Sequence, residues 1–214
     1  TSGTTGNPKG VMHSFDTFGW STQAALKRVP IDRNARILSY LPLAHVAERT
    51  LVEHGLLCKG LHVYFAESLE TFAADLQRAR PTVFFSVPRL WVKFQQGVLA
   101  KMPAQKLDRL LGIPIVRSVI RRKVLGALGL EVIEVYGMTE NCGVSHCTLQ
   151  GKPRPGTVGY PYDGVLSRID PENDEIQVTS PGTMLGYYKE PEQTRNAFTE
   201  DGGLRTGDKG VFDA

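Results

Sequence analysis

Short apolar runs alternate with longer helical patterns up to residue 136, and this alternation constrains the fold more than any other feature. Runs rich in β-branched and aromatic residues, typical of strands buried on both faces, lie at 35–41, 61–65, 82–87 and 131–136. Helical patterns follow at 44–60, where Gly60 suits a helix end, and at 68–80, where Ser68 suits an N-cap. Strand–helix–strand spacing of this kind predicts an α/β fold with a mostly parallel sheet flanked by helices.

The composition and residue pattern of the chain change after residue 150. A stretch rich in glycine and proline at 151–164 leads into a pattern typical of a β-hairpin, with its turn at 171–174. No long helical pattern follows. We therefore expect two units: an α/β unit at 1–150 that binds nucleotide and acyl group, and a smaller, incomplete β-rich unit of distorted-barrel type at 151–214.

Composition limits the classes of function. The chain is 41% hydrophobic and 22% charged, as expected of a globular protein, and its net charge of +3 does not favour a nucleic-acid partner. Cys58, Cys142 and Cys147 form no disulfide framework, which predicts a reducing, cytoplasmic environment. His146 lies beside Cys147, but no second pair has zinc-site spacing, so free thiols are expected.

The opening stretch "TSGTTGNPKG" has the chemistry of a phosphate-binding loop. Gly3, Gly6 and Gly10 permit close approach of a ligand to the backbone, and Lys9 supplies a mobile cation. Hydroxyl donors come from Thr1, Ser2, Thr4 and Thr5. A flexible linker would have a similar composition, but the helical pattern at 14–28 places this stretch at a helix N-terminus, where an anion is favoured.

Two further stretches carry polar side chains suited to a ligand. "EVYGMTEN" at 134–141 ends the fourth predicted strand, and ligands bind at the carboxyl ends of parallel strands. "GGLRTGDKG" at 202–210 presents Asp208 between glycines. Alone, Glu140 could equally be a solvated carboxylate and Asp208 an ordinary turn aspartate.

Taken in order, these stretches resemble the signature motifs of the adenylate-forming (AMP-binding) superfamily, which includes acyl-CoA synthetases, peptide-synthetase adenylation domains and luciferases. Two more stretches, at 41–49 and 180–191, lie where that superfamily has related sequences. "LPLAH" followed by "ER", together with "SVPRLW" at 86–91, looks most like the long-chain fatty acyl-CoA synthetase branch. The resemblance covers nearly the whole chain.

The resemblance implies two-step chemistry with ATP, a fatty acid and coenzyme A as substrates and Mg²⁺ as cofactor. A carboxylate attacks the α-phosphate of ATP to give acyl-AMP and pyrophosphate, and the thiol of coenzyme A then displaces AMP. Positioning and charge neutralisation are the main physical demands. The implied catalytic residues are Lys9, His45, Thr139 and Glu140. His45 would lie near the acyl carboxylate; an ordinary histidine at a helix start is the alternative.

The resemblance also implies the nucleotide contacts. Tyr136 and Gly137 would lie against adenine, Thr139 would reach the α-phosphate, Glu140 would bind Mg²⁺, and Asp208 would accept hydrogen bonds from the ribose. The β- and γ-phosphates would be held by Thr1, Ser2, Gly3, Thr4, Thr5, Gly6 and Lys9. A P-loop phosphotransferase is disfavoured, because Gly10 rather than Ser or Thr follows the lysine.

Several positions depart from the superfamily pattern. An adenine-contacting loop expected between residues 130 and 131 is absent, Asp174 stands where a turn glycine is usual, and Gly203 replaces an aromatic residue. The chain also ends before the C-terminal domain that carries the family's catalytic lysine. We therefore expect part of a large N-terminal domain that self-associates through uncovered sheet edges, with a catalytically inactive nucleotide-binding remnant as the alternative.

Residues 101–123 form a basic stretch with apolar residues at helical spacing. The preferred interpretation is a crossover helix packed on the sheet with a solvated basic face. The alternative is a helix that lies peripherally on the inner face of a membrane, held by anionic lipids.

Overall fold

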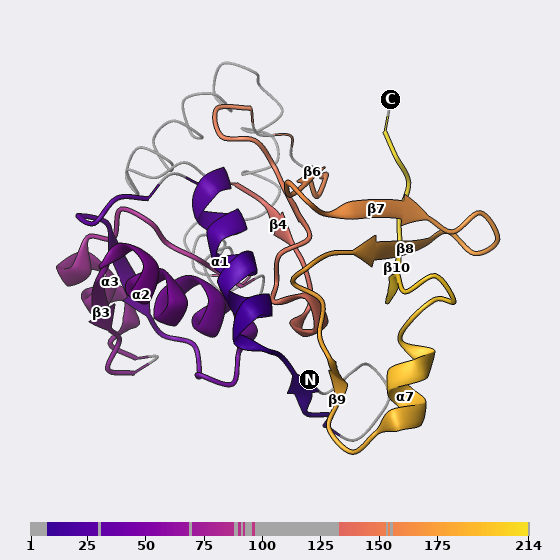
Figure 1. Ribbon diagram of the computed structural model, residues 1–214. Coiled ribbons are helices and arrows are strands. Elements are labelled where there is room, and N and C mark those ends of the chain that lie inside the picture. Colours follow the sequence, from indigo (N-terminus) through magenta and orange to yellow (C-terminus); the bar gives the residue numbers. More distant parts are fainter. Residues whose placement is uncertain are drawn as a thin grey trace.

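The computed structural model describes most of the chain outside its centre (Figure 1). The described residues are 8–29, 31–68, 70–87, 90, 92, 96, 133–152, 154 and 156–213. Residues 1–7 of the predicted phosphate loop at 1–10 and the basic stretch at 101–123 therefore lie outside the described residues.

Helices and short strands alternate in the first half, and strands dominate the second. The helical elements are α1 (Phe15–Arg28), the π-helical η1 (Glu48–Glu53), α2 (His54–Lys59), α3 (Phe72–Ala79), the 3₁₀ turn η2 (Thr139–Asn141) and α7 (Pro191–Asn196). The strands are β1 (Val11–Met12), β2 (Arg36–Ser39), β3 (His62–Phe65), β4 (Val135–Tyr136), β5 (His146–Cys147), β6 (Tyr160–Pro161), β7 (Leu166–Ile169), β8 (Glu175–Thr179), β9 (Gly186–Tyr187) and β10 (Leu204–Lys209).

Helix α1 confirms the helix predicted after the opening loop. Ser14 is its N-cap, and the Ser14 hydroxyl accepts a hydrogen bond from the Thr17 backbone N–H at 3.1 Å. Asp16 in the first turn and Lys27 and Arg28 in the last turn match the helix dipole. The helix buries one face, formed by Thr17, Ser21, Thr22, Ala25 and Leu26.

Strands β2 and β3 confirm the predicted parallel pairing, with Arg36 opposite His62 and Ser39 opposite Phe65. The crossover between them runs through η1 and α2 and ends, as expected, at Gly60, whose φ of 68° lies in the left-handed region that glycine favours. Ala35, Ile37, Val52 and Leu61 form the core beneath this pair. Figure 1 shows this part on one side of α1 and strands β7, β8 and β10 on the other.

Two predictions in this region are wrong. Segment 82–87 forms no regular strand, because the amides of Thr82 and Val83 both donate to the single carbonyl of Arg36 instead of forming a ladder. Ser68 is not the N-cap of α3; Thr71 is, and the Ser68 hydroxyl accepts from the Thr71 N–H within the preceding turn. The local hydrogen bonds of serine stabilise a turn here, which delays the helix start.

The fourth predicted strand, at 131–136, was expected to be parallel, and this prediction is also wrong for its described part, β4. β4 pairs antiparallel with β5, which pairs antiparallel with β6. A short turn returns the chain beside β4, and such a turn can join only antiparallel strands. The predicted hairpin is confirmed: β7 and β8 pair antiparallel around Asp174, which has the positive φ of 64° that explains why glycine is usual at this turn.

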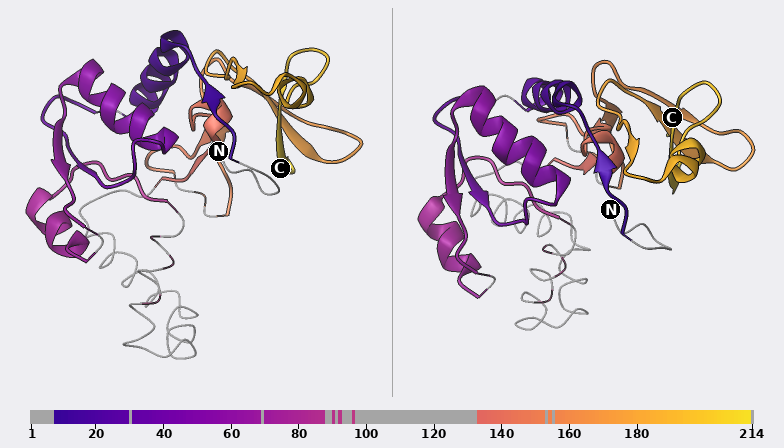
Figure 2. Two further views of the ribbon diagram at one scale, coloured as in Figure 1. Left: turned by 90° about the horizontal axis from the view of Figure 1, so that it is seen from below. Right: turned by 60° about the horizontal axis from the view of Figure 1, so that its bottom comes forward.

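Both halves of the chain contribute to one core. Ala25 of α1 packs with Val144 and Cys147 near β5 and with Tyr162 and Val178 from beyond residue 150. β1, the indigo arrow next to the N label in both views of Figure 2, also pairs with β9. The division at residue 150 stays a prediction. In the part of the chain that the structure describes, no helix is long and apolar enough to span a membrane.

Candidate functional site

The turn from Gly137 to Gly143 presents the polar residues that follow β4. The Asn141 side-chain oxygen accepts from the Met138 N–H at 2.9 Å, and the Thr50 hydroxyl donates to the Cys142 carbonyl at 3.0 Å. A Cβ on Gly137 would lie 2.4 Å from the Gly143 carbonyl carbon. Glycine is therefore required at 137 because two stretches of backbone touch there.

Glu140 is a buried carboxylate, with only 4% of its surface exposed. The Tyr187 hydroxyl donates to Glu140 Oε1 at 2.8 Å, and the Met184 N–H donates to the Glu140 carbonyl at 2.7 Å. Burial, followed by the hydrogen bond and charge of Glu140, raises the pKa of the Tyr187 phenol, so this hydroxyl stays protonated. Glu140 is thus oriented by a neutral donor.

The chemistry of Glu140 fits a Mg²⁺ ion that is shared with substrate phosphates. Mg²⁺ in nucleotide sites is commonly held by one or two carboxylates plus phosphate oxygens. Among the described residues, Glu140 Oε2 has no hydrogen bond, and no group of three His, Cys, Asp or Glu side chains could form a metal site by itself. The fit therefore requires the phosphates of the nucleotide.

Lys9 and Glu140 meet on the same tyrosine. Lys9 Nζ lies 4.4 Å from the centre of the Tyr187 ring, within the range of a cation–π interaction. Strand pairing fixes this geometry, because Val11 lies opposite Tyr187 and the Tyr188 N–H donates to the Gly10 carbonyl at 2.7 Å. The structure thus brings together one end of the predicted phosphate loop and the predicted metal ligand.

Tyr136 and Asp208 form a second contact in the site. The Tyr136 hydroxyl donates to Asp208 Oδ2 at 2.8 Å, although the two residues are 72 positions apart in sequence. Burial is the main cause that raises the pKa of Tyr136. Tyr136 is half-buried and Asp208 is exposed, so the pair borders solvent.

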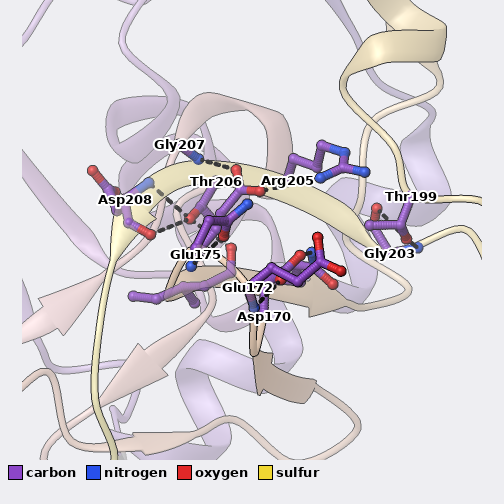
Figure 3. A network of polar contacts seen from close by, with 12 residues as sticks. Asp170, Glu172, Glu175, Thr199, Gly203, Arg205, Thr206, Gly207 and Asp208 are labelled. Atoms are coloured by element: carbon purple, nitrogen blue, oxygen red, sulfur yellow. Dashed lines mark hydrogen bonds and ion pairs between the residues drawn. The ribbon is translucent and has the colours of Figure 1, made fainter.

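An irregularity in β10 directs Asp208 toward Tyr136. The pairing of β10 with β8 shifts register between Arg205 and Lys209, and Gly207 has a φ of 74°. Figure 3 shows the supporting contacts: the Gly207 N–H donates to Glu175 Oε1 at 2.9 Å, and the Asp208 N–H donates to the Thr206 hydroxyl. Bulges of this kind commonly redirect a side chain beside a functional site.

Two histidines, His13 and His146, contact residues of the site, and no sequence signal indicated this role. His13 is half-buried, and its Nε2 donates to the Thr139 carbonyl at 2.8 Å. The buried His146 lies with its ring centre 5.8 Å from that of Tyr136, and it shares a hydrogen bond with Ser145. Burial is the main cause that lowers the pKa of both imidazoles, which favours their neutral forms.

The remaining predicted residues differ in their placement. Thr1, Ser2, Gly3, Thr4, Thr5 and Gly6 lie outside the described residues. Within the described ranges, the exposed His45 has no hydrogen bond to Thr139, Glu140 or Asp208; its Nδ1 instead accepts from the Ala47 N–H at 3.3 Å. Cys58, Cys142 and Cys147 are free thiols, as expected. Tyr187 was not predicted as a site residue, although it lies within the stretch at 180–191 that resembles a related sequence of the superfamily.

The family model described as AMP-binding enzyme matches residues 1–188, and the chain belongs to this family. The chain is 29% identical over 276 aligned positions to long-chain-fatty-acid–CoA ligase ACSBG2 of Xenopus laevis, and it is 31% identical over 251 positions to probable CoA ligase CCL8 of Humulus lupulus. These alignments include all of this chain. They include only 37% of the first relative and 40% of the second.

Solved structures give the same fold. A malonyl-CoA ligase, solved as a ternary product complex with methylmalonyl-CoA and AMP, matches all of this chain and 49% of its own, with a TM-score of 0.74 and 30% identity. An o-succinylbenzoate CoA synthetase from Bacillus subtilis, in complex with AMP, matches all of this chain and 57% of its own, with a TM-score of 0.73 and 22% identity. The predicted fold class and family are confirmed.

The chain spans about two-fifths of the length of the curated relatives named above. Both alignments are longer than the 214 residues of the chain, so these relatives have internal residues without a counterpart here. The adenine-contacting loop was expected to be absent between residues 130 and 131; that position lies outside the described residues, so its absence stays a prediction.

Proposed function

We propose that the chain forms the nucleotide-binding part of an enzyme that activates a fatty acid with ATP and transfers the acyl group to coenzyme A. The observation that carries this proposal is the meeting of Lys9 and Glu140 on Tyr187. A cation and a buried carboxylate that are far apart in sequence are held at one place, as ATP with Mg²⁺ requires. Family membership and the names of the relatives support the acid–thiol ligase activity.

In the first step, an oxygen of the fatty carboxylate forms a bond to the α-phosphorus, and the bond to the pyrophosphate oxygen breaks. Lys9, with the loop at 1–6, neutralises the β- and γ-phosphates, so that the approaching anion meets less repulsion. Thr139 donates its hydroxyl to the α-phosphate. Glu140 would hold Mg²⁺, and the bound ion would neutralise phosphate charge.

Tyr136 and Asp208 position the nucleoside. The Tyr136 ring, backed by His146, offers a flat face to adenine beside Gly137. Asp208 Oδ2 accepts a hydrogen bond from the Tyr136 hydroxyl. Oδ1 therefore remains available to accept hydrogen bonds from the ribose hydroxyls. Their contact thus orients both groups before nucleotide binds, which lowers the entropy cost of binding.

Other expectations remain proposals with support from sequence alone. His45 would contact the acyl carboxylate after movement of its exposed side chain. Peripheral membrane contact through 101–123 is supported by the excess of basic residues there. Self-association and cytoplasmic localisation are supported by the apolar strand patterns and the free thiols.

The activity is tested by pyrophosphate release from ATP with Mg²⁺, with and without a long-chain fatty acid. We expect release that requires the acid, and Asp208→Asn should lower the apparent ATP affinity about 10-fold, the scale for a hydrogen bond to a charged group. The amide oxygen of the introduced asparagine can still accept from Tyr136, so the fold contact is kept. Asp32→Asn, in an exposed turn before β2, is the matched control. Nucleotide binding without release would favour the inactive remnant instead.

A further inference from the structure

Tyr187 lies between two opposite charges of the site. Its hydroxyl donates to Glu140 Oε1 at 2.8 Å, and its ring face lies 4.4 Å from Lys9 Nζ. Only 7% of the tyrosine is exposed. One side chain therefore contacts the predicted metal ligand with its polar end and the predicted phosphate ligand with its apolar face.

The backbone around Tyr187 is held from both sides. Its N–H donates to the Thr194 hydroxyl at 2.9 Å, and β9 pairs with β1, which lies just after Lys9 in the chain. A Cβ on the preceding Gly186 would lie 2.7 Å from Thr194 Cγ2, so α7 packs closely against this strand. Tyr187 also belongs to a small core with Met184 and Leu204. These contacts fix the ring in place.

This placement solves a physical problem of the site. A lysine and a buried carboxylate that contact the same side chain attract each other, and a direct ion pair would occupy the carboxylate oxygen needed by Mg²⁺ and the ammonium needed by phosphate. The tyrosine ring occupies the space next to the ammonium, and its π face attracts the cation. Its hydroxyl satisfies one carboxylate oxygen without adding charge.

We propose that Tyr187 is a positioning residue that keeps Lys9 and Glu140 apart and orients each of them for its own ligand. The inference rests on the proposed function, because it assigns Lys9 to phosphate and Glu140 to Mg²⁺. It predicts that the hydroxyl and the ring of Tyr187 act separately. The hydroxyl serves Glu140, and the ring serves Lys9.

Two substitutions separate these roles. Tyr187→Phe keeps the ring and removes the hydroxyl, so the Mg²⁺ concentration that half-maximally strengthens ATP binding should rise about 10-fold, the scale for losing an outer contact to a metal ligand. ATP affinity without metal should stay within about twofold, since the ring still holds Lys9. Tyr187→Leu removes both contacts and should weaken ATP binding with and without Mg²⁺.

A nucleotide-free measurement tests the spacing directly. In NMR spectra of the full chain, the Lys9 ammonium and its neighbouring methylene should show ring-current shifts in wild type and in Tyr187→Phe. In Tyr187→Leu these shifts should vanish, and the ammonium should show a hydrogen bond to a carboxylate that disappears when Glu140→Gln is added. Absence of the ring-current shift in wild type would overturn the inference, whether or not ATP binds.

The controls distinguish positioning from general damage. Tyr188→Phe, at the exposed neighbouring tyrosine, should change neither the NMR signals of Lys9 nor the response to Mg²⁺. In a Glu140→Gln background, Tyr187→Phe should have no further effect on that response. An unchanged response in Tyr187→Phe, or an equal loss in the Glu140→Gln background, would contradict the inference. Wild type without any ATP binding would instead reject the proposed function, and the NMR result would still decide the spacing.

Discussion

Replacing Gly137 with alanine should remove nucleotide binding and lower the free energy of unfolding by about 3 kcal/mol, the upper range for overpacking. The added Cβ would lie 2.4 Å from the carbonyl carbon, 2.5 Å from the carbonyl oxygen and 2.8 Å from the Cα of Gly143. These are backbone atoms, which cannot rotate away as the end of a side chain can. The turn that carries Glu140 must therefore open or shift. Chemical denaturation and AMP titration measure the two effects.

Gly19→Ala is the matched control for this prediction. Gly19 lies within α1, and a Cβ there would meet no atom within 4 Å. Alanine is the better helix former by about 0.5–1 kcal/mol, so this variant should be slightly more stable than wild type and should bind nucleotide normally. Wild-type stability in Gly137→Ala would show that the backbone contact between Gly137 and Gly143 does not form.

Glu140→Gln should lower fatty-acid-dependent pyrophosphate release about 100-fold, the scale for losing a group that stabilises transition-state charge. Glutamine retains the shape of the side chain and can still accept from the Tyr187 hydroxyl, so the turn should stay folded. It cannot supply the negative charge that holds Mg²⁺ against the phosphates. The loss should appear mainly in the response to Mg²⁺, measured by varying the metal at fixed ATP.

The matched control is Glu200→Gln, at an exposed acid before β10. Its rate and Mg²⁺ response should equal those of wild type. If Glu140→Gln also kept the wild-type rate, Glu140 would not be the metal ligand, and the buried carboxylate would have a structural role only.

Local sequence signals predicted the elements whose own residues determine them. The helical pattern at 14–28 predicted α1, Gly60 predicted the end of α2, and the 171–174 turn predicted the β7–β8 hairpin. The family motifs likewise identified Tyr136 and Asp208, which the structure joins. In each case the residues of one short stretch of sequence were enough to make the prediction.

Features that depend on contacts between distant segments could not be predicted in this way. The run at 82–87 has the composition of a buried strand, but its first amides share one carbonyl of Arg36. Tyr187 contacts Glu140, 47 positions away in sequence, and its strand β9 pairs with β1; nothing in either short strand indicates that partner. Likewise, Gly137 was expected to let a ligand approach the backbone. In the structure, glycine is required at 137 because a Cβ there would collide with the backbone of Gly143.

Hydrogen exchange of the 214-residue chain with and without AMP tests the central claim most directly. The claim is that the turn after β4 and the irregular part of β10 form one nucleotide site. We predict that AMP slows amide exchange in peptides covering 134–143 and 204–209 together, and that the hairpin turn at 171–174 is unchanged. AMP that leaves exchange in both of these segments unaltered would contradict the account.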